Sequence, residues 1–294
     1  MAESPLNHPG APWLPPGRKV KLGRRGTTFI RQLDGPAGAP TVLLLHGWTV
    51  DADVNWFQCY RSLSQRFNVV AMDHRGHGRG IRSIRPFRLE DCADDVAALV
   101  HELGTGPVIP VGYSMGGPIA QLTWRRHPDI VDGLVLCATS RKFASRDPRT
   151  RLLFGSMLGL SAGARLVPAA LRRQLMDQVM GRRLNDADPF AQWVMTEVRR
   201  NDMSAVLQAG YSIGSFDSRA WLPEIDVPAA VVVTELDRLV NPRYQRDLAA
   251  AIPGATMHPV RGDHGACVMN PRQFVPALMS ACDSVASRVR SRVG

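Results

Sequence analysis

The fold is decided by one short stretch of the sequence, Gly112-Tyr113-Ser114-Met115-Gly116. It follows an apolar run at residues 107–111, which is typical of a buried strand, and it precedes a helical pattern over residues 115–127. A serine on so sharp a strand-to-helix turn needs a strained backbone, and small residues two places to either side let the chain fold that tightly. The turn exposes the hydroxyl, and the helix N-terminus favours an anion beside it. We therefore expect Ser114 to be a nucleophile.

Short apolar runs recur on both sides of this turn. They occupy residues 41–45, 68–72, 107–111, 133–138, 229–233 and 255–260, and residues 18–22 and 27–33 predict a hairpin. Consecutive apolar positions in short runs are typical of parallel strands that are covered on both faces. Helical patterns separate the runs, at residues 53–67, 89–103 and 115–127. This alternation predicts an α/β fold with a doubly wound, mostly parallel sheet.

One long stretch, residues 140–216, interrupts the alternation. It has no strand pattern but several helical patterns, one of which begins at Asp188 with a proline at the first helical position. We therefore predict an inserted, all-helical cap. The predicted domains are a flexible leader at residues 1–17, a core formed by residues 18–139 and 217–294, and the cap between its two parts.

The chain is basic, with 36 Lys and Arg against 26 Asp and Glu and a net charge of +10. Most of these cations are arginines spread along the chain, without a helix-turn-helix, zinc-finger or RNP motif, so we predict no nucleic-acid partner. The cap carries 12 of the basic residues against 6 acidic ones. Its leucines and methionines fit either simple packing between helices or the lining of a pocket for an acyl chain, and its arginines are compatible with peripheral contact with anionic lipid.

The sequence also excludes several other classes of protein. No apolar run approaches the roughly 20 residues of a membrane-spanning helix, and the proline-rich first twenty residues do not fit a signal peptide, so the expected location is the cytoplasm. The five cysteines are scattered and form no CxxC pair, which is typical of reduced structural thiols. His74 and His77 lack further ligands at suitable spacing. We predict no metal and no cofactor.

A serine hydroxyl needs a general base to take its proton, and the base needs an acid to orient it. Asp237 and His264 each come directly after an apolar run, at the ends of strands where open α/β sheets place their sites. We predict Ser114 as the nucleophile, His264 as the base and Asp237 as the acid. Glu235 lies too close to its strand to compete, and Asp263 adjoins the histidine too tightly to reach its far ring nitrogen.

Four motifs together resemble the α/β-hydrolase superfamily. They are His46-Gly47-Trp48, Asp73-His74-Arg75-Gly76-His77-Gly78, Gly112-Tyr113-Ser114-Met115-Gly116-Gly117 and the Asp237/His264 pair, and the resemblance covers about residues 18 to 287. The resemblance implies that the backbone N–H groups of Trp48 and Met115 form an oxyanion hole. It also implies that residues 73–78 form a structural loop.

The resemblance leaves two points open. Some members of the family carry the acid one strand earlier, which here would select Asp147; we prefer Asp237 because it stands four residues past a strongly apolar strand. Many relatives also place histidine before the nucleophile, where this chain has Tyr113. We expect that difference to change the contacts around the turn and not those of the Ser-His-Asp triad.

A serine at this turn implies acyl chemistry, because the dehalogenases and epoxide hydrolases of the family carry aspartate there. The predicted function is that of a carboxylesterase or lipase-like enzyme, which cleaves an ester of a hydrophobic or lipid-like acyl group through an acyl-enzyme. Two alternatives stay open. One is a carbon–carbon hydrolase of the meta-cleavage type, which shares the triad and cap. The other is a non-catalytic ligand-binding scaffold, against which the intact Ser114, Asp237 and His264 argue.

Overall fold

Residues 10–143, 152, 154–161 and 188–293 are described by the structure, which is a computed structural model. In this part of the chain eight strands form one sheet, in the order β1-β2-β4-β3-β5-β6-β7-β8. The strands are β1 Gly17–Lys21, β2 Thr27–Leu33, β3 Thr41–Leu45, β4 Asn68–Met72, β5 Val108–Tyr113, β6 Leu134–Cys137, β7 Ala229–Thr234 and β8 Thr256–Val260. Strand β2 pairs antiparallel with β1 and β4, and the other neighbours pair in parallel. The predicted α/β fold is confirmed.

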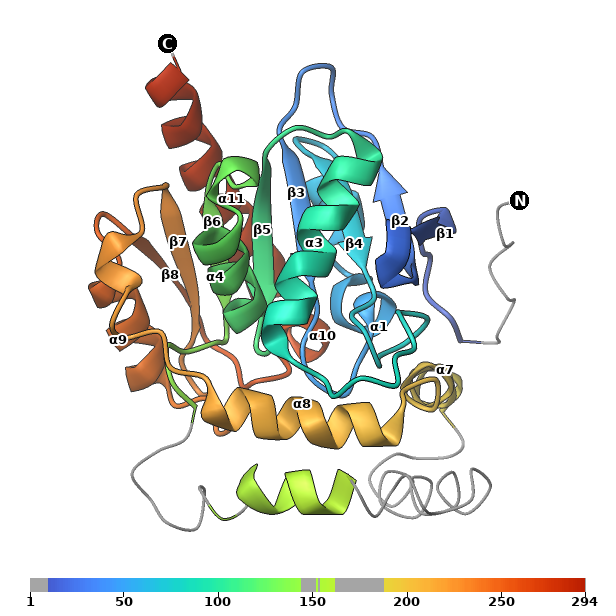
Figure 1. Ribbon diagram of the computed structural model, residues 1–294. Coiled ribbons are helices and arrows are strands. Elements are labelled where there is room, and N and C mark those ends of the chain that lie inside the picture. Colours follow the sequence, from blue (N-terminus) through green and yellow to red (C-terminus); the bar gives the residue numbers. More distant parts are fainter. Residues whose placement is uncertain (1–9, 144–151, 153, 162–187, 294) are drawn as a thin grey trace.

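Helices cover both faces of this sheet (Figure 1). One face packs against α3 Leu89–Leu103, α4 Gly116–Arg126 and α9 Pro242–Ala251. The other face packs against α1 Ala52–Trp56, α2 Tyr60–Leu63, α10 Ala266–Met269 and α11 Pro271–Val293. Short 3-10 turns lie at Gly23–Arg25, Pro128–Ile130 and Leu222–Glu224. None of the helices in the described ranges is both long and apolar enough to cross a membrane.

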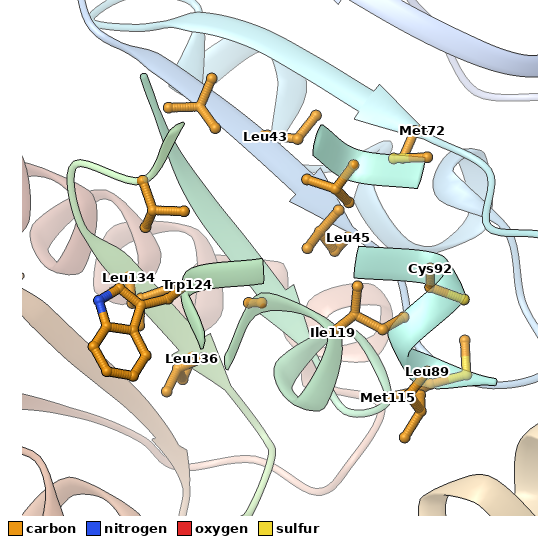
Figure 2. Close-up of a cluster of buried hydrophobic side chains, with 14 of the residues drawn as sticks. Leu43, Leu45, Met72, Leu89, Cys92, Met115, Ile119, Trp124, Leu134 and Leu136 are labelled. Carbon is orange, nitrogen blue, oxygen red and sulfur yellow. The ribbon is translucent and has the colours of Figure 1, made fainter. Parts of the chain in front are cut away.

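The sheet divides the apolar interior into two cores, because successive residues of a strand point to opposite faces. In β3, Leu43 and Leu45 belong to the core beneath α3 and α4, whereas Val42 and Leu44 belong to the core on the opposite face. Figure 2 shows part of the first core, in which the Met115 side chain is buried. Burial on both faces explains why the central strands carry apolar residues at consecutive positions.

Two helices of the predicted cap, α7 Pro189–Val198 and α8 Met203–Ser215, lie beyond the carboxyl ends of the parallel strands (Figure 1). The Asp188 side chain accepts a hydrogen bond from the Phe190 amide at 3.0 Å, so α7 begins where its N-cap and proline indicated. Residues 154–161 are also helical. The remaining cap residues from 144 to 187, and residues 1–9 of the leader, lie outside the described residues, so the domain boundaries stay predictions.

The prediction of a single helix over residues 53–67 is wrong. The chain forms α1 and α2, and between them the Cys59 amide bonds to the Trp56 carbonyl at 2.8 Å in a tight turn. Phe57 in this turn packs against Phe190 and Trp193 of α7, with ring centroids 5.5 and 5.6 Å away. The break between α1 and α2 therefore coincides with a contact to α7, which is distant in the sequence. The local spacing of apolar residues does not predict such a contact.

Candidate active site

The turn at Ser114 is strained and sterically crowded. Ser114 has a φ of 51°, in the left-handed region that residues with a side chain rarely adopt. A Cβ at Gly112 would lie 2.2 Å from the Gly116 carbonyl oxygen, and one at Gly116 would lie 2.1 Å from the Leu45 carbonyl oxygen. Both positions therefore require glycine. The turn leaves Ser114 only half-buried at the end of β5, so its hydroxyl stands at the carboxyl edge of the sheet.

The structure brings Ser114, His264 and Asp237 into one chain of hydrogen bonds. Ser114 Oγ lies 3.0 Å from His264 Nε2, and His264 Nδ1 lies 2.8 Å from Asp237 Oδ2. Asp237 follows β7 and His264 follows β8, and these strands are parallel neighbours whose carboxyl ends meet at the same edge. The Asp237 side chain is fully buried, whereas the His264 side chain is 18% exposed. This arrangement suits proton transfer from serine to an imidazole that a carboxylate orients.

Asp237 is held by four further donors that the sequence analysis missed. Its Oδ2 also accepts from the Thr234 hydroxyl at 2.7 Å and from the Gln245 side-chain amide at 3.1 Å. Its Oδ1 accepts from the backbone amides of Leu239 and Val240 at 2.9 and 2.8 Å. These bonds lock the carboxylate with Oδ2 toward the imidazole. A threonine that ends a strand and a glutamine on the next helix carry no signal in the sequence that would identify them.

The competing acids have other partners. Asp263 Oδ1 accepts from the backbone amides of Arg238 and His264 at 3.0 and 2.7 Å, and these bonds lower the pKa of Asp263. Glu235 is exposed and pairs with Arg246 at 3.4 Å. Asp147 lies outside the described residues. Among the carboxylates that the structure describes, Asp237 is the one hydrogen-bonded to the His264 ring.

The predicted oxyanion groups flank the serine. The turn of Trp48 approaches it so closely that a Cβ at Gly47 would lie 3.5 Å from Ser114 Cβ. Within the described residues, no hydrogen bond uses the backbone N–H of Trp48 or Met115 as donor, whereas the Gly47 amide is bound to Asn55 Oδ1 at 2.8 Å. Both predicted amides are therefore available to an anion. The Trp48 indole donates to the Val206 carbonyl at 2.8 Å, which ties this turn to cap helix α8.

Tyr113 reaches the proposed base, contrary to our expectation. Its hydroxyl donates to the backbone carbonyl of His264, and the two rings meet edge-on with centroids 5.9 Å apart. The expectation that residue 113 would not affect the triad is wrong, because Tyr113 contacts His264 directly. The reason is geometric: Tyr113 is the last residue of β5, and its side chain is long enough to touch the loop after β8.

The loop at residues 73–78 contains a cluster of buried rings. His74 and His77 lie 4.3 and 5.5 Å from His46, centroid to centroid. Burial lowers the pKa of all three histidines, that of His77 to about 3, so the rings are neutral. Across the described residues, no three His, Cys, Asp or Glu side chains are arranged to hold a metal ion.

Comparisons with known proteins place the chain in a family. A family model described as the alpha/beta hydrolase fold matches residues 40–271. The chain is 28% identical over 276 residues to RutD of Caulobacter vibrioides, provisionally named a carbamate hydrolase, and the match covers 90% of this chain and 98% of that protein. It is 28% identical over 223 residues to the pimeloyl-[acyl-carrier protein] methyl ester esterase of Neisseria meningitidis, covering 76% of this chain and 70% of the relative.

The fold is also similar to that of solved structures. The enol-lactonase from Burkholderia xenovorans superposes with a TM-score of 0.73 at 22% sequence identity, covering 90% of this chain and all 100% of that one. At this identity the likeness concerns the fold alone. With a family model that spans most of the chain and a sheet of the same architecture, the chain belongs to the alpha/beta hydrolase fold family.

Proposed function

We propose that this protein is a serine hydrolase that cleaves carboxylic esters of hydrophobic acyl groups through an acyl-enzyme on Ser114. One observation carries the proposal, namely the continuous hydrogen bonding from Ser114 Oγ through both ring nitrogens of His264 to Asp237. Such a chain activates a hydroxyl that is otherwise a weak nucleophile. A hydrolytic activity is also what the family membership supports.

In the proposed reaction, Ser114 Oγ attacks the ester carbonyl carbon as its proton passes to His264 Nε2. Asp237 stabilises the imidazolium, and the backbone N–H groups of Trp48 and Met115 bind the oxyanion. Collapse of this intermediate breaks the bond to the alcohol oxygen, which takes the proton from His264 and leaves. Water then attacks the acyl-enzyme and gives a proton to His264. The acid departs from Ser114, which recovers its proton.

Two observations support the substrate class. The names of the two curated relatives refer to a carbamate and a methyl ester, both of which are cleaved at a carbonyl carbon. Apolar side chains also gather beside the Trp48 turn. A Cβ at Gly210 of α8 would lie 2.4 Å from Met157 Sδ and 2.8 Å from Cζ2 of Trp48. The cap therefore brings a methionine against the indole, which favours a hydrophobic acyl chain.

A labelling experiment tests the proposal. A fluorophosphonate probe is expected to modify the wild-type protein on one serine, and the protein is expected to hydrolyse p-nitrophenyl butyrate. The Ser114→Ala variant is expected to be neither labelled by the probe nor able to hydrolyse the ester. Ser140→Ala is the matched control, because Ser140 is a buried serine beyond the next strand whose hydroxyl donates to the Lys142 carbonyl. Labelling that survives in Ser114→Ala would disprove the assignment.

A substrate panel then separates the alternatives. Esters of increasing acyl length, a carbamate and a meta-cleavage dienoate are compared at equal concentration. Preference for longer acyl esters is the expected result. Turnover of the dienoate alone would favour the carbon–carbon hydrolase. Ligand binding without any turnover or labelling would favour the non-catalytic scaffold.

A further inference from the structure

The hydroxyl of Tyr113 donates a hydrogen bond to the backbone carbonyl of His264, and the proposed reaction does not use this bond. Its acceptor, the His264 carbonyl, lies in the loop between β8 and the four-residue helix α10, and the hydrogen bonds of the described residues give this carbonyl no other donor. The backbone of the proposed base is therefore tied directly to the residue that precedes the proposed nucleophile. Burial raises the pKa of Tyr113, so its hydroxyl stays protonated and remains a donor.

The Tyr113 ring is itself fixed in place. It is 3% exposed and meets Trp56 of α1 and Phe274 of α11 edge-on, with centroids 5.9 and 5.6 Å away. Both partners are fully buried. Aromatic side chains locked by such packing keep one rotamer, so the hydroxyl presents a rigid support to the His264 loop.

The same support extends to the oxyanion turn. Burial and the neighbouring thiol of Cys267, which is itself buried in α10, both raise the pKa of the Tyr113 hydroxyl. The Asn55 side chain donates to Cys267 Sγ at 3.8 Å and accepts from the Gly47 amide at 2.8 Å. Asn55 and Cys267 thus link the turn that carries Trp48 to the loop that carries His264, behind the reacting atoms.

We propose that Tyr113 is a positioning residue, which with Cys267 and Asn55 forms a rigid layer that fixes the distance between His264 and Ser114. This inference rests on the proposed function for its kinetic consequence, but its geometric consequence is independent of any substrate. Loss of the hydroxyl frees the His264 carbonyl and lets the loop move. The Ser114 Oγ to His264 Nε2 contact is then no longer held at its 3.0 Å separation.

The test compares two tyrosine-to-phenylalanine variants. Tyr113→Phe removes the hydroxyl and keeps the ring. Tyr60→Phe is the matched control, because Tyr60 is also fully buried and its hydroxyl donates to a backbone carbonyl, that of Ala52, at 3.2 Å. Each variant loses one buried hydroxyl–carbonyl bond, so a purely structural effect lowers Tm in both.

Two readouts distinguish positioning from stability. For p-nitrophenyl butyrate, Tyr113→Phe is expected to lower kcat by about tenfold or more while KM stays within about twofold, since small misplacements of reacting groups are costly. The rate of fluorophosphonate labelling of Tyr113→Phe is expected to fall by the same factor as its kcat. The downfield proton NMR signal of the His264–Asp237 hydrogen bond is expected to broaden in Tyr113→Phe and to be retained in Tyr60→Phe.

The outcomes separate this inference from the proposed function. Wild-type protein without esterase activity, but with the NMR change confined to Tyr113→Phe, would refute the function and support the positioning role. An active wild type whose two phenylalanine variants behave alike in kcat and in the NMR signal would refute the positioning role and leave the function standing.

Discussion

Replacing Asp237 by Asn tests the proposed acid without changing its shape. The Leu239 and Val240 amides donate to Oδ1, so they hold the amide oxygen of the new side chain in that place. The new NH2 group then occupies the position of Oδ2 and faces His264 Nδ1, 2.8 Å away in the wild type. The imidazole must accept there, which places its proton on Nε2. That nitrogen can no longer take the proton of Ser114.

The expected cost follows from this wrong tautomer. A loss of about 10⁴ in kcat is typical when a triad aspartate becomes asparagine, and it corresponds to about 5.4 kcal/mol at 1.36 kcal/mol per tenfold. The NH2 group also faces the Gln245 amide, whose orientation is set because its Oε1 accepts from the Thr234 backbone amide at 3.0 Å. This conflict is expected to lower the free energy of unfolding by about 1–3 kcal/mol.

The assay is p-nitrophenyl butyrate hydrolysis, with circular dichroism and Tm to establish that the variant is folded. Asp263→Asn is the matched control, because Asp263 adjoins the histidine and binds its backbone amide but not its ring. We expect it, and Asp147→Asn, to stay within a few-fold of the wild type. Near-normal turnover in Asp237→Asn, together with loss of activity in either of the other two variants, would refute the reasoning.

Three further predictions concern the turn and the buried histidines. Met115→Leu should keep activity within a few-fold and lose less than about 1.5 kcal/mol, because the backbone N–H is retained and the side chain lies in the core; loss of hydrolysis would contradict the backbone role. Gly116→Ala should lose about 3 kcal/mol or more in urea unfolding, since its Cβ would meet the Leu45 carbonyl at 2.1 Å. Gly155→Ala, whose Cβ would meet no atom of the described residues within 4 Å, should not lose stability. The three fully buried histidines, His46, His74 and His77, have lowered pKa values and bind protons mainly when unfolded, so stability should fall as the pH drops below about 6.5. The raised pKa of Asp51 opposes part of this loss, and equal urea midpoints at about pH 6.5 and about pH 5.5 would refute the prediction.

The main features of the fold could be predicted because they depend on local sequence. Central strands that are buried on both faces need apolar residues at consecutive positions, and β3 and β4 coincide with the predicted runs 41–45 and 68–72. Gly112 is required by a contact within the serine turn, with the Gly116 carbonyl, and Gly116 by the Leu45 carbonyl of β3, and the two glycines appear in the sequence as a fixed spacing. Ser114, Asp237 and His264 could be assigned to one site because each comes shortly after an apolar run that predicts a strand.

The predictions that failed depended on contacts between distant segments. The break between α1 and α2 coincides with the packing of Phe57 on α7, more than a hundred residues away. The role of Tyr113 depends on the position of the loop after β8 in the folded protein. The residue type at position 113 does not by itself predict a hydrogen bond to His264. The donation from Gln245 to Asp237 likewise exists only after α9 has packed on β7.

The sequence by itself therefore determined the class of sheet, the serine turn and the residue types of the candidate triad, because apolar runs, the glycine spacing and the polar residues that follow strands are all local patterns. Only the tertiary structure decided the distances among Ser114, His264 and Asp237 and the rigid layer behind them. Those distances depend on how neighbouring parallel strands stagger and on which side chains fill the space between their loops. Such long-range packing is a property of the whole folded chain, and no local pattern encodes it.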